Sequence, residues 1–214
     1  DFFRKGGKEV LAAFEQLAEA GYRDWKLNIV SKLDYGDYAS RTTKEDLDEA
    51  RRIIEKFPEN IFHYNTLPNE QVLDLFRQSD VGLLPTYADS YGYSVLEAQA
   101  AGCSVITTDI RALPEINDAE KGWVISVPKN EWGNGLLDTP AERAHFSQLL
   151  LEQLIVILRE ILEDRGMARR KGEQALAKFA QPRHSVAGNA RILETLYEEI
   201  APAGQREAVN KAVL

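Results

Sequence analysis

The chain has 214 residues, and its 34 acidic residues outnumber its 26 lysines and arginines to give a formal net charge of −8. A chain of this length buries roughly 70 % of its unfolded surface, so its core needs neither disulfides nor a structural metal. The acidic balance argues against a general nucleic-acid binder, because non-specific affinity for a phosphate backbone comes from clustered Lys and Arg. With Cys103 as the single cysteine and with three histidines, the sequence has no cluster of metal-ligand spacing, and no metal is expected.

Apolar spacing predicts alternating helices and strands over residues 1–127. The predicted elements are, in chain order, a helix at Gly7–Glu19, a strand at Trp25–Val30, a helix at Thr43–Lys56, a strand at Ile61–Tyr64, a helix from Pro68 through Phe76, a strand at Asp80–Pro85, a helix from about Tyr93 to Ala101, and strands at Ser104–Thr108 and Trp123–Val127. This alternation is typical of a parallel sheet flanked by helices. We therefore predict an α/β, Rossmann-like domain over residues 1–127, with its first strand lost before Asp1.

The pattern becomes entirely helical after Pro128. Helices are predicted at Ala141–Asp164, Met167–Ala180 and His184–Ile200. We expect residues 128–200 to form a helical extension packed on the same domain, and residues 201–214 to form a disordered tail.

Ligands of an open parallel sheet bind outside the carboxyl ends of the strands, so the loops there are the place to look for chemistry. No predicted strand is followed by GxGxxG or GxxxxGK[ST], which argues against a nicotinamide enzyme and a P-loop NTPase. The turn RKGGK at Arg4–Lys8 begins the first predicted helix, where lysine and free backbone N–H groups could hold a pyrophosphate. The alternative interpretation is a solvated basic terminus.

A second candidate is the segment Leu83–Asp109. A buried strand is followed there by a loop with Asp89 and Gly92, and then by a helix with Glu97 one turn inside it. Gly92 has no Cβ, so the backbone around it can approach a ligand closely. Both carboxylates would face the cleft and accept hydrogen bonds from sugar hydroxyls. The alternative is an ordinary loop acid and an exposed acid on an amphipathic helix.

The pattern D-x7-E followed by AxAxGxxVI resembles the E-x7-E donor-binding motif of retaining GT-B glycosyltransferases of group 1 (GT4). Lys5-Gly6 resembles the KG that opens the first helix of that family's C-terminal domain, and ALPEI at Ala112–Ile116 resembles its LPEI-like turn. The resemblance covers most of residues 2–200. It implies the C-terminal, nucleotide-sugar-binding half of a hexosyltransferase that transfers a sugar to an acceptor with retention and without a metal or other cofactor.

Roles carry over from the family position by position. The resemblance implies that Lys5 neutralises the diphosphate leaving group and that Asp89 contacts the transferred sugar, which makes these two the candidate catalytic residues. It further implies that Glu97 binds the ribose hydroxyls, and that the loop after the second predicted strand brackets the base, with Asn65 taking the left-handed backbone of the family's usual glycine. The donor-binding residues implied are Asn65, Thr66, Leu67, Tyr91, Gly92, Tyr93, Ser94 and Glu97.

The sequence departs from the family at two places. Asp89 is one methylene shorter than the family's Glu, and a misplacement of about 1 Å can cost on the order of 100-fold in rate. The family's arginine, a few residues before the lysine, would precede Asp1. Other interpretations are a nucleotide-sugar epimerase or phosphorylase of the same fold, and a non-catalytic module that binds a nucleotide sugar or a partner protein.

The resemblance also implies the partners of this chain. The partners are a nucleotide-sugar donor, an unknown acceptor and an N-terminal acceptor-binding domain of the same chain, without which this half is expected to be inactive. No nucleic acid is expected among them. A cytoplasmic location is expected from the cysteine usage. The apolar helix at Ala141–Asp164 contains Glu152 and Arg159, so it is predicted to be buried rather than membrane-spanning; the whole enzyme could still be peripheral at a membrane.

Overall fold

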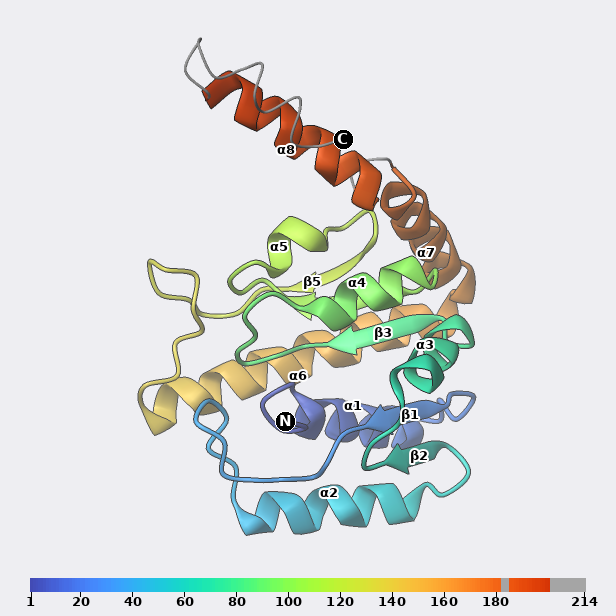
Figure 1. Cartoon of the computed structure of the whole chain (residues 1–214). Coiled ribbons are helices and arrows are strands. Elements are labelled where there is room, and N and C mark those ends of the chain that lie inside the picture. Colours follow the sequence, from blue (N-terminus) through green and yellow to red (C-terminus); the bar gives the residue numbers. More distant parts are fainter. Residues whose placement is uncertain (182–184, 201–214) are drawn as a thin grey trace. The chain divides into compact units, whose positions relative to one another are not determined.

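The structure is a computed structural model that describes residues 1–181 and 185–200 (Figure 1). These residues divide into two compact units, one formed by residues 1–176 and the other by the described residues from Ala177 onward. The elements are α1 (Gly7–Glu19), β1 (Leu27–Val30), α2 (Lys44–Lys56), β2 (Ile61–Tyr64), α3 (Asn69–Arg77), β3 (Val81–Leu84), α4 (Tyr93–Ala100), β4 (Ser104–Thr108), α5 (Leu113–Ile116), β5 (Gly122–Ile125), α6 (Pro140–Glu163), α7 (Arg165–Phe179) and α8 (Val186–Ile200). The tail predicted at 201–214 lies outside the described residues, and so does His184 at the predicted start of the last helix.

All strand pairs are parallel, which confirms the predicted α/β class. β1 pairs with β2, and β4 lies between β3 and β5. Among the described strands, β1 and β3 do not pair with each other, so there are two sheets where the sequence predicted one. Hydrophobic spacing identifies strands but does not specify which strands pair. The strand expected before Asp1 stays a prediction.

Element boundaries differ from the predicted ones where side chains bond outside the regular structure. The strand predicted from Trp25 begins at Leu27, because Trp25 packs into an aromatic cluster: its ring centroid lies 4.7 Å from that of Phe14, and its indole N–H donates to the carbonyl oxygen of Tyr22 at 2.9 Å. Thr43 is the N-cap of α2 rather than its first residue. These shifts of one or two residues leave the order of the predicted elements unchanged, and the short helix α5 is an additional element where the sequence predicts a turn.

The helices α1 and α6 pack against each other and form much of the core (Figure 1). Leu11 and Leu17 of α1 and Phe146, Leu150 and Leu154 of α6 are almost completely buried. The spacing of four residues places Phe146, Leu150 and Leu154 on one face of α6. The apolar segment of α6 is therefore a buried helix, as predicted, and no helix in the described part of the chain is long and apolar enough to span a membrane.

Candidate functional site

The turn that begins α1 is held against the end of β3. Gly6 has φ +78, and a Cβ placed on it would lie 2.1 Å from the carbonyl oxygen of Pro85, so only glycine fits there. The N–H of Tyr87 donates to the carbonyl oxygen of Arg4 at 2.9 Å. These backbone contacts bring Lys5 to the loop that follows β3, which is the loop of the second candidate segment.

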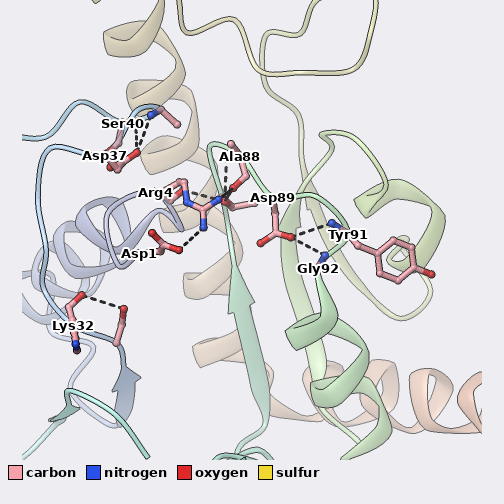
Figure 2. A network of polar contacts seen from close by, with 12 residues as sticks. Asp1, Arg4, Lys32, Asp37, Ser40, Ala88, Asp89, Tyr91 and Gly92 are labelled. Atoms are coloured by element: carbon pink, nitrogen blue, oxygen red, sulfur yellow. Dashed lines mark hydrogen bonds and ion pairs between the residues drawn. The ribbon is translucent and has the colours of Figure 1, made fainter.

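Arg4 adds side-chain contacts between the same two segments (Figure 2). Its Nη1 donates to the carbonyl oxygen of Ala88 at 3.2 Å, and its Nη2 pairs with Asp1 Oδ2 at 2.5 Å. The guanidinium carbon also lies 5.9 Å from the ring centroid of Tyr38, a cation–π distance. No pattern in the sequence gives Arg4 a role of its own, whereas in the structure it joins the N-terminal turn to the loop after β3.

Asp89 determines the shape of this loop. Its Oδ1 accepts hydrogen bonds from the N–H groups of Tyr91 at 3.2 Å and Gly92 at 2.8 Å (Figure 2). Gly92 has φ +87, and a Cβ on it would lie 2.6 Å from Leu113 Cδ2, so the loop needs glycine here. Two of the N–H groups expected to bind a ligand are therefore occupied by Asp89 itself.

The open groups of this site lie at the start of α4. The N–H groups of Tyr93 and Ser94 are in the first turn, where an α-helix has no backbone acceptor for them. Glu97 is half-buried one turn further along, and its carboxylate makes no hydrogen bond or ion pair with a described residue. The same holds for Oδ2 of Asp89 and for the ammonium of the half-buried Lys5. The site thus offers one cation, N–H donors and two carboxylate acceptors.

The loop Asn65–Leu67 follows β2, in the other sheet from β3. Asn65 lines a cavity of about 540 Å³ together with Lys32 and His63, and neither Lys5 nor Asp89 lines it. Asn65 is not in the left-handed region, because the two described non-glycine residues with positive φ lie in other loops. The expectation that Asn65 replaces a left-handed glycine is therefore wrong, and its role at the base stays a prediction.

His63 and Cys103 have structural partners. His63 Nε2 lies 2.8 Å from the carbonyl oxygen of Ser31. Cys103 is buried, and its Sγ donates to the carbonyl oxygen of Phe76 at 2.9 Å. Burial raises the pKa of the Cys103 thiol to about 11, which disfavours the nucleophilic thiolate. Both side chains therefore have structural contacts, and neither is assigned a catalytic role.

A cavity of about 240 Å³ that the sequence does not indicate lies beside Asp89. Arg41, Arg111 and Arg143 line it, together with Ala88 from the loop after β3. Each arginine lies in a different loop or helix and resembles an ordinary exposed charge in the sequence. No local signal in the sequence indicates that the three share one cavity.

The sequence also gave no indication that Glu9, in the first turn of α1, is a buried carboxyl group. Its Oε1 accepts hydrogen bonds from Tyr87 Oη at 2.7 Å and from Ser147 Oγ at 2.6 Å, whereas Oε2 has no partner. Burial raises the pKa of Glu9 above its ordinary value, and the two hydrogen bonds oppose this rise. The carboxyl group is enclosed, and its two hydrogen bonds join α1 to Tyr87 in the loop after β3 and to Ser147 of α6.

No group of three His, Cys, Asp or Glu side chains in the described parts of the chain could hold a metal ion. The parallel α/β fold, with a lysine turn and a D-x7-E segment at the strand ends, is that of a GT-B glycosyltransferase domain. The chain belongs to the group 1 glycosyltransferases: the family model described as "Glycosyl transferases group 1" matches residues 2–137.

Individual proteins agree with this assignment. A D-inositol 3-phosphate glycosyltransferase of Corynebacterium jeikeium is 29 % identical over 141 residues, which are 65 % of this chain and 28 % of that protein. The structure of WaaG, described as a glycosyltransferase involved in lipopolysaccharide biosynthesis, is similar with a TM-score of 0.62 at 23 % identity over 90 % of this chain and 44 % of its own. Anabaena Alr3699/HepE, solved in complex with UDP and glucose, has a TM-score of 0.52 at 15 % identity over 86 % and 51 %. At these identities the two structures support the fold alone. The chain spans less than a third of the length of the curated relatives that it matches first.

Proposed function

We propose that this chain is the donor-binding part of a glycosyltransferase that transfers a sugar from a nucleoside diphosphate to an acceptor. The observation that carries the proposal is the close approach of Gly6 to Pro85, which brings the Lys5 turn to the loop of Asp89 and Gly92. A cation at a helix start and a sugar-binding carboxylate are the two things that a nucleotide sugar needs at its reacting bond. Membership of the group 1 family supports the same chemistry.

Lys5 is assigned the leaving group. As the bond between the sugar and the phosphate breaks, negative charge grows on the phosphate oxygens, and an ammonium group held near them stabilises the transition state more than the ground state. The N–H groups of Tyr93 and Ser94 reinforce this effect, because the positive end of the α4 dipole lies at these groups and also attracts negative charge. Sugar transfer then needs no metal ion, and retention of configuration follows the family resemblance.

Asp89 and Glu97 are assigned to the two sugars of the donor. Asp89 uses Oδ1 to hold its own loop, which leaves Oδ2 to accept a hydroxyl of the transferred sugar. Glu97 has both carboxylate oxygens available for the vicinal hydroxyls of the ribose. The short side chain of Asp89 suits this double use, because a carboxylate one methylene longer could not close the same tight turn onto the N–H of Gly92. Asn65, Thr66 and Leu67 are assigned to the base.

Thermal shifts with UDP, GDP and ADP and their glucose or mannose conjugates test the proposal, because a ligand that binds the folded state raises its melting temperature. We expect the nucleotides that carry one of the three bases to raise the melting temperature of the wild-type chain. Lys5→Met should weaken binding of that nucleotide roughly ten- to a hundredfold, as expected for a lost charged hydrogen bond. Lys44→Met, which removes an exposed lysine at the start of α2, is the matched control.

Either of two results would overturn the proposal. One is the absence of any shift from all the nucleotides while the chain melts cooperatively. The other is an equal loss of affinity in Lys5→Met and Lys44→Met, which would mean that general charge rather than the turn binds the phosphates. Transfer of the sugar itself is tested in the full-length protein, because this chain spans less than a third of the length of its first curated relatives and the remaining part is assigned a share of the acceptor site.

A further inference from the structure

We propose that the cavity lined by Arg41, Arg111 and Arg143, named the arginine cavity below, binds a phosphate group that does not belong to the donor. The cavity has a volume of about 240 Å³. This is below the usual range for sites that enclose a whole drug-sized ligand, and it suits one small anionic group with part of the molecule that carries it.

The charge of the arginine cavity is opposite to that of the chain. Three arginines and one acid, Asp138, line it, whereas the chain as a whole has a net charge of −8. A recess lined by one sign of charge concentrates ions of the other sign. Guanidinium groups are also the preferred partners of phosphate, because their N–H groups form a fork that matches two phosphate oxygens.

Two of the three arginines adopt a left-handed backbone conformation, which is unfavourable for residues other than glycine. Arg41 has φ 53 and Arg111 has φ 45, and they are the two non-glycine residues with positive φ in the described part of the chain. Both belong to the same cavity. Left-handed backbone at residues with a Cβ is strained, and such residues gather at functional sites where the strained side chain is needed.

The hydrogen bonds of the cavity orient the guanidinium groups without exhausting them. Arg111 Nε donates to Asn134 Oδ1 at 2.5 Å, and Arg143 Nη1 donates to the carbonyl oxygens of Leu137 at 2.6 Å and Asp138 at 3.1 Å. A guanidinium has five N–H donors, so both groups keep several for a ligand. The guanidinium of Arg41 has no hydrogen bond or ion pair among the residues that the structure describes.

The location of the cavity relates its ligand to the reaction. Ala88 lines the cavity, and Arg111 Nη1 reaches the carbonyl oxygen of Asp89 at 3.4 Å. Arg111 therefore contacts the backbone of the residue whose carboxylate is assigned to the transferred sugar. A phosphate bound here lies next to the sugar but is distinct from the diphosphate at Lys5. We therefore assign it to the acceptor, a step that rests on the proposed function, whereas binding of phosphate itself does not.

The test measures binding of inorganic phosphate by ³¹P line broadening at constant ionic strength. Arg41→Gln and Arg111→Gln should each weaken binding roughly ten- to a hundredfold, the change expected for one charged hydrogen bond. Arg23→Gln removes an exposed arginine from the loop before β1 and is the matched control. Equal affinity in all three variants would overturn the proposal.

Two further measurements separate this proposal from the donor site. Phosphate should still bind to Lys5→Met and to wild-type chain saturated with the nucleotide that raises its melting temperature most. If either condition removes phosphate binding, the anion occupies the donor site and the proposal is wrong. If no nucleotide binds but phosphate binding still depends on the arginines, the proposed function fails and the anion site stands.

The source of the phosphate is distinguished with two probes, glycerol 3-phosphate in solution and phosphatidylcholine vesicles that contain phosphatidic acid. Competition with inorganic phosphate by glycerol 3-phosphate alone assigns a water-soluble phosphate monoester. Co-sedimentation of the wild-type chain with the vesicles, abolished in Arg41→Gln and in Arg111→Gln, identifies the ligand of the arginine cavity as a lipid headgroup. If neither probe competes for the arginine cavity, the assignment to a phosphate ester is wrong.

Discussion

Gly6→Ala is the substitution that probes the assembly of the site most severely. Gly6 combines two constraints: a left-handed backbone, with φ +78, and a distance of only 2.1 Å between its would-be Cβ and the carbonyl oxygen of Pro85. Left-handed backbone costs a residue with a Cβ about 1–2 kcal/mol. Forcing a methyl group into a packed contact costs typically a further 1–3 kcal/mol. Gly6→Ala should therefore lower the free energy of unfolding by about 2–5 kcal/mol.

Gly21→Ala provides a matched control, because Gly21 follows the same helix at φ +99 and its Cβ would meet nothing within 4 Å. This variant should lose only the backbone contribution of about 1–2 kcal/mol. Urea unfolding gives both values, and titration with the nucleotide identified in the thermal-shift panel gives the effect on binding. We expect Gly6→Ala to weaken that binding and Gly21→Ala to leave it unchanged. Equal destabilisation by the two substitutions would refute the close approach that positions Lys5.

Three other predictions concern Glu9, Asp89 and Arg41. Because burial raises the pKa of Glu9 above 4.5, the folded state binds its proton more tightly than the unfolded state, so stability falls as pH rises from the unfolded pKa towards the folded one. The wild-type chain should therefore melt at a lower temperature at pH 8 than at pH 5, and Glu9→Gln should reduce this difference. An undiminished difference would contradict the raised pKa of a buried Glu9 carboxyl group. Asp89→Asn keeps an acceptor for the turn, so it should retain affinity for the nucleoside diphosphate while losing the preference for the sugar conjugate. Asp89→Ala also loses the two hydrogen bonds of the turn, of about 1 kcal/mol each, and should lose affinity for both ligands. Calorimetric titration measures both affinities, and identical affinities in the two variants would exclude the role of Asp89 in holding the turn. Arg41→Gly relieves left-handed strain and should raise the free energy of unfolding by about 1 kcal/mol while phosphate affinity falls, so urea unfolding that shows lower stability would count against a strained functional residue.

Apolar spacing predicts the order of the helices and strands apart from α5, which is too short to show a helical repeat. α1 was predicted to the residue, and its buried positions Val10, Leu11, Phe14 and Leu17 are the ones that define the pattern. Strand pairing was not predictable in the same way. The separation of β1 and β3 depends on which strands are neighbours, and no pattern within a single strand specifies its neighbour.

The candidate site was predictable only where its residues are close in sequence or match a family motif. The D-x7-E segment placed Asp89 and Glu97 on one loop and one helix, as the structure shows. Capture of the Gly92 N–H by Asp89 needed coordinates, although an acid three residues before a glycine is a common turn former. The arginine cavity escaped detection because Arg41 and Arg143 are about a hundred positions apart and meet only in the fold.

A thermodynamic cycle between the Glu97 carboxylate and the ribose hydroxyls tests directly whether this chain binds a nucleotide-sugar donor at α4. Calorimetry compares the nucleoside diphosphate with its 2′,3′-dideoxy form, in the wild-type chain, in Glu97→Gln and in the control Glu70→Gln, which changes an exposed acid at the start of α3. The account predicts that wild type and Glu70→Gln bind the hydroxylated ligand more tightly by about 1.5–3 kcal/mol, and that this gap largely disappears in Glu97→Gln. An equal gap in all three proteins would show that Glu97 does not bind the ribose and would contradict the assignment of the donor site.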